Sequence, residues 1–348
     1  MTKFATSAHG MNSIIREICF KYIPFERYFE IKNMYEDPSR HYHNWKHVLH
    51  VAFSLSKGDF NKTDFEILMI SAFLHDAVYD THSKTNEYDS AQLVDEFDLP
   101  QSSKDIIKDI ILATTYRDQP SDTLINAFMD ADLDIFNQSE SSQLEFEKQI
   151  FKEYYWVSIK DYVPARIKIL ENLKEKFGCK TDFLVSYLKT KKWNVGFYPG
   201  TFYPFHIGHQ SVLTQSEHMF DKIIIGFGNI SDKTSFRWNM DKYGELNQWV
   251  YDNYETVPLE ALITDNIAEL RRYSNITIIR GLRNSTDLIY EQNYLQALRD
   301  LLPDVTVAYF MTDPKLAHVS SSLIRDLLKL SPKDAYKYYN NDALCKIT

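Results

Sequence analysis

The sequence has few cysteines and no hydrophobic segment long enough to cross a membrane. Its three cysteines, Cys19, Cys179 and Cys345, lie far apart and form no Cys-x-x-Cys pair, which favours free thiols over a disulfide framework. The longest apolar runs, such as 223–225, are much shorter than the roughly 20 residues that span a bilayer. Residues 1–13 lack the apolar core of a secretory signal. We therefore expect a cytoplasmic protein that does not bind membranes.

A surplus of basic residues is also lacking, since the formal net charge is −9. Proteins that bind nucleic acids usually present a basic face, so we expect no nucleic-acid partner. No internal repeat and no low-complexity segment is present. The chain has 348 residues, of which 44% are hydrophobic and 25% charged. These values are ordinary for a soluble globular protein, and the length suffices for two or three domains.

The character of the sequence changes near residue 190. Before that point, apolar residues recur three and four positions apart, as in 65–73, and this spacing predicts helices. After the basic run 189–192, which we interpret as a solvated linker, short strand patterns alternate with helical ones. Strands are predicted at 194–198, 222–227, 275–280 and 305–310. We expect an all-α domain over residues 1–190, followed by an α/β domain with a Rossmann-like parallel sheet over residues 191–348.

Polar side chains follow the predicted strands of the C-terminal half. The first strand leads into Gly-Thr-Phe-Tyr-Pro-Phe-His-Ile-Gly-His at 200–209, and the third ends in Arg-Gly-Leu-Arg at 280–283. A serine run at 320–322 follows the fourth strand and begins a helix. In open parallel sheets ligands bind at the carboxyl ends of the strands, and helix N-termini bind phosphates. The sequence therefore predicts a nucleotide-phosphate site built from these segments.

Histidine and arginine side chains in these segments suit the transfer of a phosphate-containing group. Such a reaction places negative charge on the transferred phosphate and on the leaving group, so the protein mainly positions the reactants and stabilises charge. We expect His206 and His209 to donate hydrogen bonds to phosphate oxygens. Arg280 and Arg283 are expected to hold phosphates through bidentate contacts.

Further polar groups are expected around the same phosphates. The hydroxyl and backbone N–H groups of Ser320, Ser321 and Ser322 suit the β- and γ-phosphates of a nucleotide. Asp287 and Glu291 lie four residues apart on one predicted helix face, where they either bind ribose or orient the arginines.

The segment 194–348 resembles the bacterial phosphopantetheine adenylyltransferases, which belong to the HIGH-motif nucleotidyltransferase superfamily. The resemblance rests on Tyr-Pro-Gly-Thr-Phe at 198–202, on Arg-Gly-Leu-Arg at 280–283 with Asp, Tyr and Glu following it, and on Val-Ser-Ser-Ser at 319–322. It implies a reaction in which ATP, with Mg²⁺, transfers its adenylyl group to a small phosphorylated acceptor. The acceptor most like the family's own is 4′-phosphopantetheine, which gives dephospho-coenzyme A and pyrophosphate in coenzyme A biosynthesis.

The same resemblance implies roles for individual residues. Thr201 would contact the phosphate of the acceptor, His209 the α-phosphate, and Arg280 the acceptor. Arg283, Glu291 and the serine run would hold ATP. The site expected for ATP and the acceptor is completed by Phe202, Gly208, Gly281 and Asp287.

Three positions depart from the family pattern. Tyr203 stands where the family has an aspartate, and Asp232 stands where it has a lysine that serves the acceptor and the transition state. Either Lys233 substitutes for that lysine as a catalytic residue or the acceptor differs. His206 replaces a threonine or serine, as in nicotinamide mononucleotide adenylyltransferases, so a transferase of that type is the alternative.

The N-terminal half carries a second group of histidines and aspartates. His43 and His47 lie four residues apart, which would place them on one helix face, and the pair His75 and Asp76 follows an apolar helical stretch. A later stretch, Asp-Ala-Asp-Leu-Asp, occupies 130–134. Imidazole and carboxylate ligands suit divalent manganese, iron, cobalt or zinc, and such an ion makes hydroxide available for attack on phosphorus. The pattern predicts a metal-dependent phosphohydrolase site.

This half resembles the HD superfamily of metal-dependent phosphohydrolases, and the resemblance covers roughly residues 20–188. It rests on Arg-His-Tyr-His-Asn at 40–44, on Phe-Leu-His-Asp-Ala-Val-Tyr-Asp at 73–80, and on Asp-Ala-Asp-Leu at 130–133. The resemblance implies that the helical domain is of the HD type and hydrolyses a nucleotide or another phosphorylated metabolite.

The HD resemblance also implies a role for each residue of this group. The metal ligands would be His47, His75, Asp76 and Asp132. His43 would donate a proton to the leaving oxygen. Asp130 is the alternative fourth ligand, because spacing alone does not separate it from Asp132.

Together, the two halves predict a bifunctional enzyme that acts on the phosphates of nucleotides or cofactors. In one alternative the HD half is a regulatory module that senses a nucleotide and gates the transferase. In another, both halves form a non-catalytic scaffold. Members of the transferase family often form hexamers, so the resemblance also implies a homo-oligomer.

Overall fold

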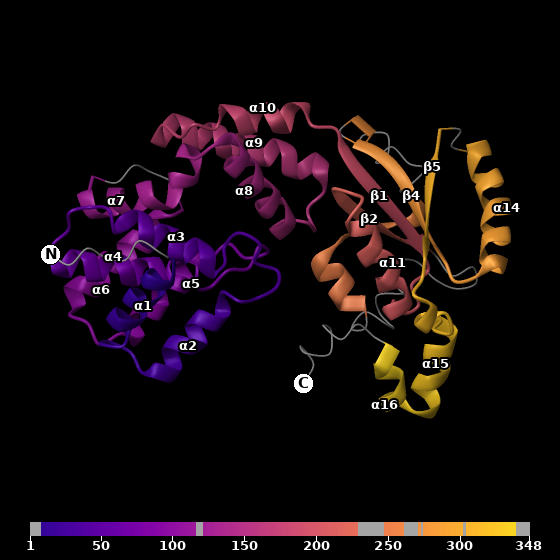
Figure 1. The fold of residues 1–348 in the computed structure, drawn as a ribbon, viewed down its shortest axis with the longest axis horizontal. Coiled ribbons are helices and arrows are strands. Elements are labelled where there is room, and N and C mark those ends of the chain that lie inside the picture. The colour runs from indigo at the N-terminus through magenta and orange to yellow at the C-terminus, as the bar shows by residue number, and fades with distance from the viewer. Residues whose placement is uncertain are drawn as a thin grey trace. The chain divides into compact units, whose positions relative to one another are not determined.

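A computed structural model describes residues 8–115, 121–228, 247–260, 271–272, 274–301 and 304–338. The chain divides into two compact units, Met1–Tyr154 with Ala165–Lys189 and Tyr155–Pro164 with Thr190–Thr348. Among the described residues the first unit is built of helices, and the second contains a parallel sheet (Figure 1). The prediction of a helical region followed by a parallel α/β region is confirmed.

Four of the helices that precede the sheet pack around one central helix, α4. Its residues from Ile67 to Leu74 are all buried, and α1, α3, α6 and α7 contact it. His75 follows α4 directly and is therefore inside the core, with 1% of its surface exposed. The elements of this region are α1 (Ala8–Cys19), α2 (Phe25–Met34), α3 (Trp45–Leu55), α4 (Lys62–Leu74), α5 (Asn86–Gln92), η1 (Leu93–Glu96), α6 (Gln101–Ala113), α7 (Thr123–Asp132), η2 (Leu133–Asn137), α8 (Glu140–Glu153), α9 (Ile159–Phe177) and α10 (Asp182–Thr190).

The second unit contains a five-stranded parallel sheet in the order β3-β2-β1-β4-β5. Its strands are β1 (Trp193–Gly200), β2 (Lys222–Phe227), β3 (Glu255–Pro258), β4 (Ser274–Leu282) and β5 (Thr306–Met311). All but β3 were predicted, with boundaries within two residues. The signal for β3 is weak because this strand has four residues and none of them is buried. The strand order reverses between β1 and β4, which is where nucleotides bind in open α/β sheets.

Helices and short turns connect the strands of this unit. They are α11 (Ile207–Glu217), a helix at 247–253, α14 (Ser285–Leu301), η4 (Pro314–Leu316), α15 (Ser321–Leu330), α16 (Pro332–Ala335) and η5 (Tyr336–Tyr338). β1 is the central strand and is buried from Val195 to Pro199, so the loop that follows it lies at the middle of the sheet's carboxyl edge.

Residues 155–164, which include the first turns of α9, belong to the second unit. The buried ammonium group of Lys222, at the start of β2, donates to the carbonyl oxygens of Tyr155, at 2.9 Å, and Val157, and pairs with Glu255 at 2.9 Å. The Tyr155 hydroxyl accepts a hydrogen bond from the N–H of Ile223 at 2.7 Å. The second unit is therefore completed by residues from far upstream of the expected boundary at 190.

Candidate functional site

The loop that follows β1 carries both histidines of the His-Ile-Gly-His motif. His206 is the N-cap of α11, and its Nδ1 accepts a hydrogen bond from the N–H of Gly208 at 3.1 Å. His209 lies in the first turn, and its Nδ1 accepts from the N–H of His206 at 3.3 Å. The two imidazoles thus form a reciprocal cap at the start of the helix.

This cap fixes the tautomer of both imidazoles. Because each Nδ1 accepts a backbone N–H, the proton of the neutral ring lies on Nε2, which becomes a donor. The two rings stack with their centroids 3.7 Å apart. Burial and the charge of Arg283 lower the pKa of His206 to about 4, and burial together with His206 and Arg283 holds the pKa of His209 well below its usual range. At neutral pH both rings are therefore uncharged hydrogen-bond donors.

Two glycines of the site leave no room for a side chain. A Cβ atom on Gly208 would lie 3.0 Å from the His206 ring, so a larger residue would displace the stacked imidazoles. A Cβ atom on Gly281 would lie 2.8 Å from Cγ2 of Val212, where α11 crosses the end of β4. Both residues therefore shape the site through close packing.

Two arginines at the end of β4 are each held by a carboxylate of α14. Arg280 donates from Nε and Nη2 to the two oxygens of Glu291, at 2.7 and 2.5 Å. Arg283 donates from the same two atoms to Asp287, at 3.0 and 3.2 Å, and this hydrogen bonding lowers the pKa of Asp287. Of the two roles expected for these carboxylates, the geometry favours orienting the arginines over binding ribose.

The serine run uses its hydroxyls within the protein. The Ser320 hydroxyl caps α15, and the Ser321 hydroxyl donates to the carbonyl oxygen of Pro204 at 2.9 Å. Ser321 thereby ties the start of α15 to the histidine loop. Its hydroxyl proton is committed to that contact, which leaves the backbone N–H groups of the first turn as donors for phosphate.

Ser322 does not share the site predicted for it. Its side chain is exposed and accepts a hydrogen bond from Nη2 of Arg325 at 2.9 Å. Ser320 and Ser321 line the cavity described below, and Ser322 does not.

Arg325, which the sequence analysis missed, holds the loop that carries the two histidines. Its Nη1 donates to the carbonyl oxygen of Tyr203 at 2.6 Å, and its guanidinium lies 5.1 Å from the centroid of the Tyr203 ring. Tyr203 thus offers this arginine a ring surface as well as a carbonyl oxygen. The only sequence signal was the position of Arg325 one helical turn after the serine run.

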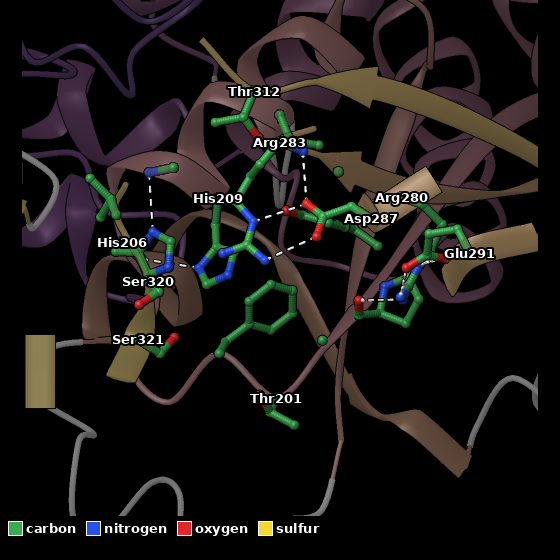
Figure 2. Close-up of a pocket in the computed structure, with 18 of the residues that line it drawn as sticks. Thr201, His206, His209, Arg280, Arg283, Asp287, Glu291, Thr312, Ser320 and Ser321 are labelled. Atoms are coloured by element: carbon green, nitrogen blue, oxygen red, sulfur yellow. Dashed lines mark hydrogen bonds and ion pairs between the residues drawn. The ribbon is translucent and has the colours of Figure 1, made fainter. Parts of the chain in front are cut away.

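One cavity of about 370 Å³ brings the groups of the C-terminal half together (Figure 2). The predicted residues that line it are Thr201, Phe202, His206, Gly208, His209, Arg280, Gly281, Arg283, Asp287, Glu291, Ser320 and Ser321. Tyr290 and Thr312 also line it, although neither was predicted as a site residue. Lys233 lies outside the described residues. Three segments that are far apart in the sequence thus meet at the carboxyl edge of β1 and β4.

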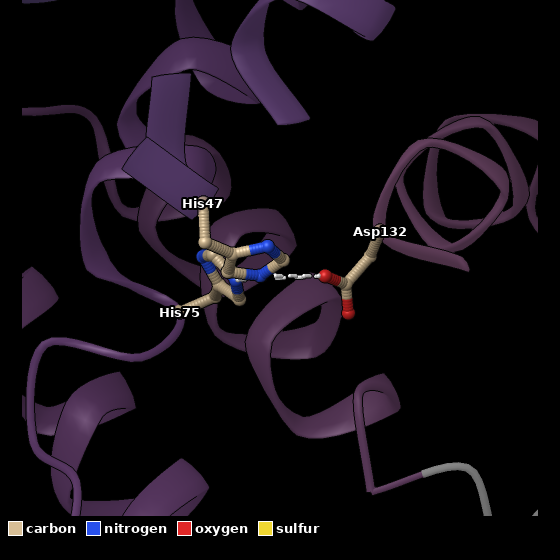
Figure 3. A group of neighbouring side chains, drawn as sticks. All are labelled: His47, His75 and Asp132. Atoms are coloured by element: carbon tan, nitrogen blue, oxygen red, sulfur yellow. Dashed lines mark hydrogen bonds and ion pairs between the residues drawn. The ribbon is translucent and has the colours of Figure 1, made fainter. Parts of the chain in front are cut away.

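In the helical unit, the four residues expected to bind metal lie together. The Nε2 atoms of His47 and His75 are 3.1 Å apart. Oδ1 of Asp132 lies 3.0 and 3.7 Å from these two nitrogens (Figure 3), and Oδ2 of Asp76 lies 3.4 and 3.0 Å from them. Ligand atoms about 2.1 Å from one ion would be about 3.4 Å apart at the corners of a tetrahedron. The ligand atoms of His47, His75 and Asp132 all lie within 4.8 Å of one another and fit a single divalent ion, and Asp76 contacts both imidazoles beside them.

The imidazole of His75 is oriented as a metal ligand would be. Its Nδ1 contacts the carbonyl oxygen of Ala72 at 3.1 Å, which places the ring proton on Nδ1 and directs the Nε2 lone pair into the cluster. Burial disfavours the charged form of His47, but Asp132 and Asp76 outweigh it and raise the pKa of His47 to about 10. A divalent ion would replace such protons as the partner of the two carboxylates.

The structure distinguishes the two aspartates between which spacing could not decide. Asp132 ends α7 and faces the histidines, whereas Asp130 is exposed and lines a different cavity beside Asp134 and Cys179. On a helix, neighbours two positions apart point in nearly opposite directions, so only one of the pair can reach the cluster. Asp132 is thus the aspartate of this pair placed to bind metal.

His43 lies beside this cluster and is held by Glu153. Nδ1 of His43 lies 2.6 Å from Oε2 of Glu153, and the His43 ring stacks on Tyr79 with centroids 4.4 Å apart. The Tyr79 hydroxyl donates to the same carboxylate at 2.8 Å. Burial raises the pKa of Glu153, but the charge and hydrogen bonds of His43 outweigh this and lower it. The arrangement resembles that of an acid–base histidine oriented by a buried carboxylate.

Arg40 connects the segments that carry these residues. Its guanidinium donates to the carbonyl oxygens of Asp76, at 2.7 Å, and Ala77, at 2.8 Å, and also to that of His43 at 3.3 Å. The side chain is buried, so its charge is balanced by these carbonyl dipoles and by the ring faces of neighbouring tyrosines. Sequence reasoning missed the roles of Arg40, Tyr79 and Glu153.

Comparisons with known proteins match the second unit. The cytidylyltransferase-like family matches residues 197–327. A phosphopantetheine adenylyltransferase from Cytophaga hutchinsonii is 34% identical over 148 residues, which cover 39% of this chain and 89% of that protein. Proteins of the same name from Mycoplasma mycoides and Bacteroides fragilis are each 32% identical, over 37% and 38% of this chain and 93% and 86% of theirs.

Within the described residues, no helix combines the length and the apolar character needed to cross a membrane.

Proposed function

Since the chain belongs to the phosphopantetheine adenylyltransferase family through its C-terminal region, we propose that this region transfers an adenylyl group from ATP to 4′-phosphopantetheine. The observation that carries the proposal is the single cavity in which His209, Arg283 and the start of α15 meet. Neutral Nε2–H donors, guanidinium groups and the N–H groups of a helix start are the groups that a triphosphate requires.

The proposed reaction is a displacement at the α-phosphorus of ATP. An oxygen of the acceptor's phosphate forms a bond to the α-phosphorus, and the bond from that phosphorus to the bridging oxygen of the β-phosphate breaks. Pyrophosphate leaves with the electron pair. His209 donates from Nε2 to an α-phosphate oxygen, and Arg283 stabilises the charge on the phosphates. His206 keeps the His209 ring in place by stacking on it and by donating its N–H to Nδ1.

Magnesium accompanies ATP in this proposal and neutralises part of the phosphate charge. Both carboxylates that line the described part of the cavity, those of Asp287 and Glu291, already pair with arginines. Phosphate oxygens and water are therefore the ligands expected for the ion, as is usual for Mg²⁺ bound with a nucleotide.

Pyrophosphate release tests the transferase. The full chain is incubated with ATP, Mg²⁺ and 4′-phosphopantetheine, and the His209→Ala variant is compared with it. We expect a loss of about 100-fold or more, because a neutral donor to the transition state is removed. His218→Ala is the matched control, since His218 is exposed at the end of the same helix. Equal rates for wild type and the His209 variant would refute the assignment.

The acceptor is tested in the same assay by replacing 4′-phosphopantetheine with nicotinamide mononucleotide. His206 and Asp232 depart from the family pattern, so a mononucleotide is the alternative acceptor. Dephospho-coenzyme A formation supports the proposed acceptor. Turnover with nicotinamide mononucleotide and none with 4′-phosphopantetheine would show that the mononucleotide is the acceptor.

We also propose a second activity, metal-dependent phosphohydrolysis, for the helical unit. It is supported by the convergence of two imidazole nitrogens and the Asp132 oxygen, which lie within 4.8 Å of one another, with an Asp76 oxygen in contact with both nitrogens. His47, His75, Asp76 and Asp132 would hold a divalent manganese, iron, cobalt or zinc ion. Such an ion supplies Lewis-acid charge and lowers the pKa of bound water.

In this proposal His43 protonates the leaving oxygen, and Glu153 positions it. The buried carboxylate fixes the His43 ring through Nδ1, which leaves Nε2 to face the leaving oxygen as the donor. Water supplies the oxygen that bonds to phosphorus and gives up one proton to solvent. The bond from phosphorus to the ester oxygen breaks, and that oxygen leaves with the proton from His43.

Metal content tests the cluster directly. Elemental analysis of the purified chain should find one divalent ion, and Asp132→Asn should lose it because a charged ligand is removed. Asp130→Asn is the matched control, since the same change is made two residues away on the exposed face of α7. Metal content that is unaffected by Asp132→Asn would exclude this ligand set.

Glu153→Gln separates catalysis from metal binding. The variant keeps a hydrogen-bonding side chain but removes the carboxylate charge that lies beside Nδ1 of His43. We expect phosphomonoester hydrolysis to fall about 10- to 100-fold with metal content unchanged. Full activity in this variant would remove Glu153 from the mechanism. A metal-loaded wild type that binds nucleotides but hydrolyses none would identify the unit as a regulatory sensor.

A further inference from the structure

The loop between β1 and α11 adopts a conformation that needs outside support. Phe202 has a positive φ of 40°, which is unusual for a residue with a side chain. Its ring is buried and packs edge-on against the His209 ring, with centroids 5.0 Å apart, while the Phe205 ring lies 5.2 Å from the same imidazole. The position of His209 therefore depends on where these two phenylalanines are held.

Asn247 contacts both of these residues through its side-chain amide. Its Nδ2 donates to the carbonyl oxygen of Phe202 at 3.1 Å, and its Oδ1 accepts from the N–H of Phe205 at 2.9 Å. The two partners, one a pure acceptor and the other a pure donor, fix which end of the amide is which. Asn247 is completely buried, so no water competes for these bonds.

The two hydrogen bonds require a side chain that both donates and accepts a hydrogen bond and that has the length of asparagine. Aspartate at neutral pH has no donor for the Phe202 carbonyl, leucine has neither group, and glutamine is one carbon longer. Two other carbonyl groups of the loop are held from α15, by Arg325 at Tyr203 and by Ser321 at Pro204. Asn247 thus supports the loop from a different element, the helix at 247–253.

We propose that Asn247 is a positioning residue of the adenylyl transfer, which holds the Phe202–Phe205 turn and thereby places His209 against the α-phosphate. The proposal rests on the transferase activity proposed above. Asn247 touches neither nucleotide nor acceptor in this scheme, and it acts only through the loop. Its loss should therefore lower kcat more than it raises KM for ATP, because the donor is misplaced in the transition state while the phosphate-binding helix start is unchanged.

The Asn247→Asp variant gives the sharpest test. At pH 8 its carboxylate would face the Phe202 carbonyl oxygen, and we expect kcat to fall about 10- to 100-fold. When the buried carboxyl is protonated, its O–H can donate to Phe202 and its other oxygen can accept from Phe205, as the amide does. Burial raises the pKa of such a group, so kcat relative to wild type should recover as the pH falls towards 5.5.

The groups near the substituted position do not mask this recovery. Burial raises the pKa of Tyr251 on the same helix and outweighs a hydrogen bond with Asn247 that lowers it, so the tyrosine keeps its proton across this range. Burial, His206 and Arg283 hold the pKa of His209 well below its usual range, so that ring stays neutral. Asn253→Asp is the matched control, because Asn253 lies on the same helix and donates to the carbonyl oxygen of Trp249 instead of the loop. It should keep wild-type kcat at both pH values.

Amide hydrogen exchange provides a readout that needs no activity. In Asn247→Asp at pH 8, the segment 202–209 should exchange faster than in wild type after correction for pH, and the difference should shrink at pH 5.5. Should the aspartate variant not fold at pH 8, Asn247→Ala is assayed for the same split between kcat and KM. The proposal is overturned if Asn247→Asp has the same kcat as wild type at pH 8, or if its loss of kcat does not recover at pH 5.5. A wild type without transferase activity refutes the proposed function instead, and the exchange data then decide whether Asn247 holds the loop.

Discussion

At the scale of single residues, the two histidines after β1 illustrate how backbone contacts define chemistry. The sequence motif predicts imidazoles near a phosphate, but not their charge. The reciprocal cap places the proton of each ring on Nε2, while burial and Arg283 exclude a second proton. Positive charge for the phosphates then comes from the arginines, and the histidines contribute directed donors.

A pH titration tests this neutral state. The pKa of His206 is lowered to about 4 from an ordinary value near 6.5. We expect its Cε1–H signal in an NMR titration to stay constant from pH 8 down to about pH 5. Because the folded pKa lies below the unfolded one, the unfolded chain takes up a proton first. This histidine's contribution to stability is therefore complete above about pH 6.5 and is lost as the pH falls towards 4. A shift of that signal with a midpoint near 6.5 would contradict the assigned tautomer and charge.

Residues that position other residues were the ones that sequence reasoning could not find. His209, Arg283 and His75 stand in recognisable motifs, and the structure places each in a cluster with its expected neighbours. Glu153 contacts His43 across 110 residues of sequence, and Asn247 contacts Phe202 across 45. No local spacing connects such pairs, because only the tertiary fold brings them together.

At the scale of elements, periodicity predicted the type of most segments but not which face of each would be used. The strands β1, β2, β4 and β5 have strong apolar runs, whereas β3 has four partly exposed residues. The end of α7 places Asp132 inward and Asp130 outward, which a count of residues could not decide. In the serine run, Ser320 caps α15 and Ser321 binds the histidine loop at Pro204. The composition of the run does not indicate these roles.

The contact between β2 and the segment 155–157 leads to a stability prediction. Lys222 is fully buried, and burial lowers its pKa although Glu255 pairs with it. Lys222→Met keeps the shape of the side chain but leaves a carboxylate and two carbonyl groups without their donor. We expect a loss of about 3 kcal/mol in the free energy of unfolding, measured with urea.

The control for this loss is Lys189→Met. Lys189 forms an exposed ion pair with Glu171, and such surface pairs contribute less than about 1 kcal/mol. Equal effects of the two variants would show that the buried ammonium group does not hold the segment in place.

At the scale of the whole molecule, each proposed site is built from one unit. The described residues that line the nucleotide cavity all belong to the second unit, and the described residues of the metal cluster all belong to the first. The two activities are therefore expected to respond separately to substitution. Asp132→Asn should leave pyrophosphate release unchanged, and His209→Ala should leave metal content unchanged.

The units are nevertheless interleaved along the chain, because residues 155–164 complete the second one. A fragment that begins at residue 191 lacks them, so Lys222 loses two carbonyl acceptors and the N–H of Ile223 loses the Tyr155 hydroxyl. We expect this fragment to melt at least about 5 °C below the transferase unit of the intact chain, as measured by differential scanning fluorimetry. A synthetic peptide of residues 155–164 should restore part of the difference, and the same peptide with Tyr155→Ala should restore less. A fragment as stable as the intact unit, or one that ignores the peptide, would show that the sheet does not depend on this segment.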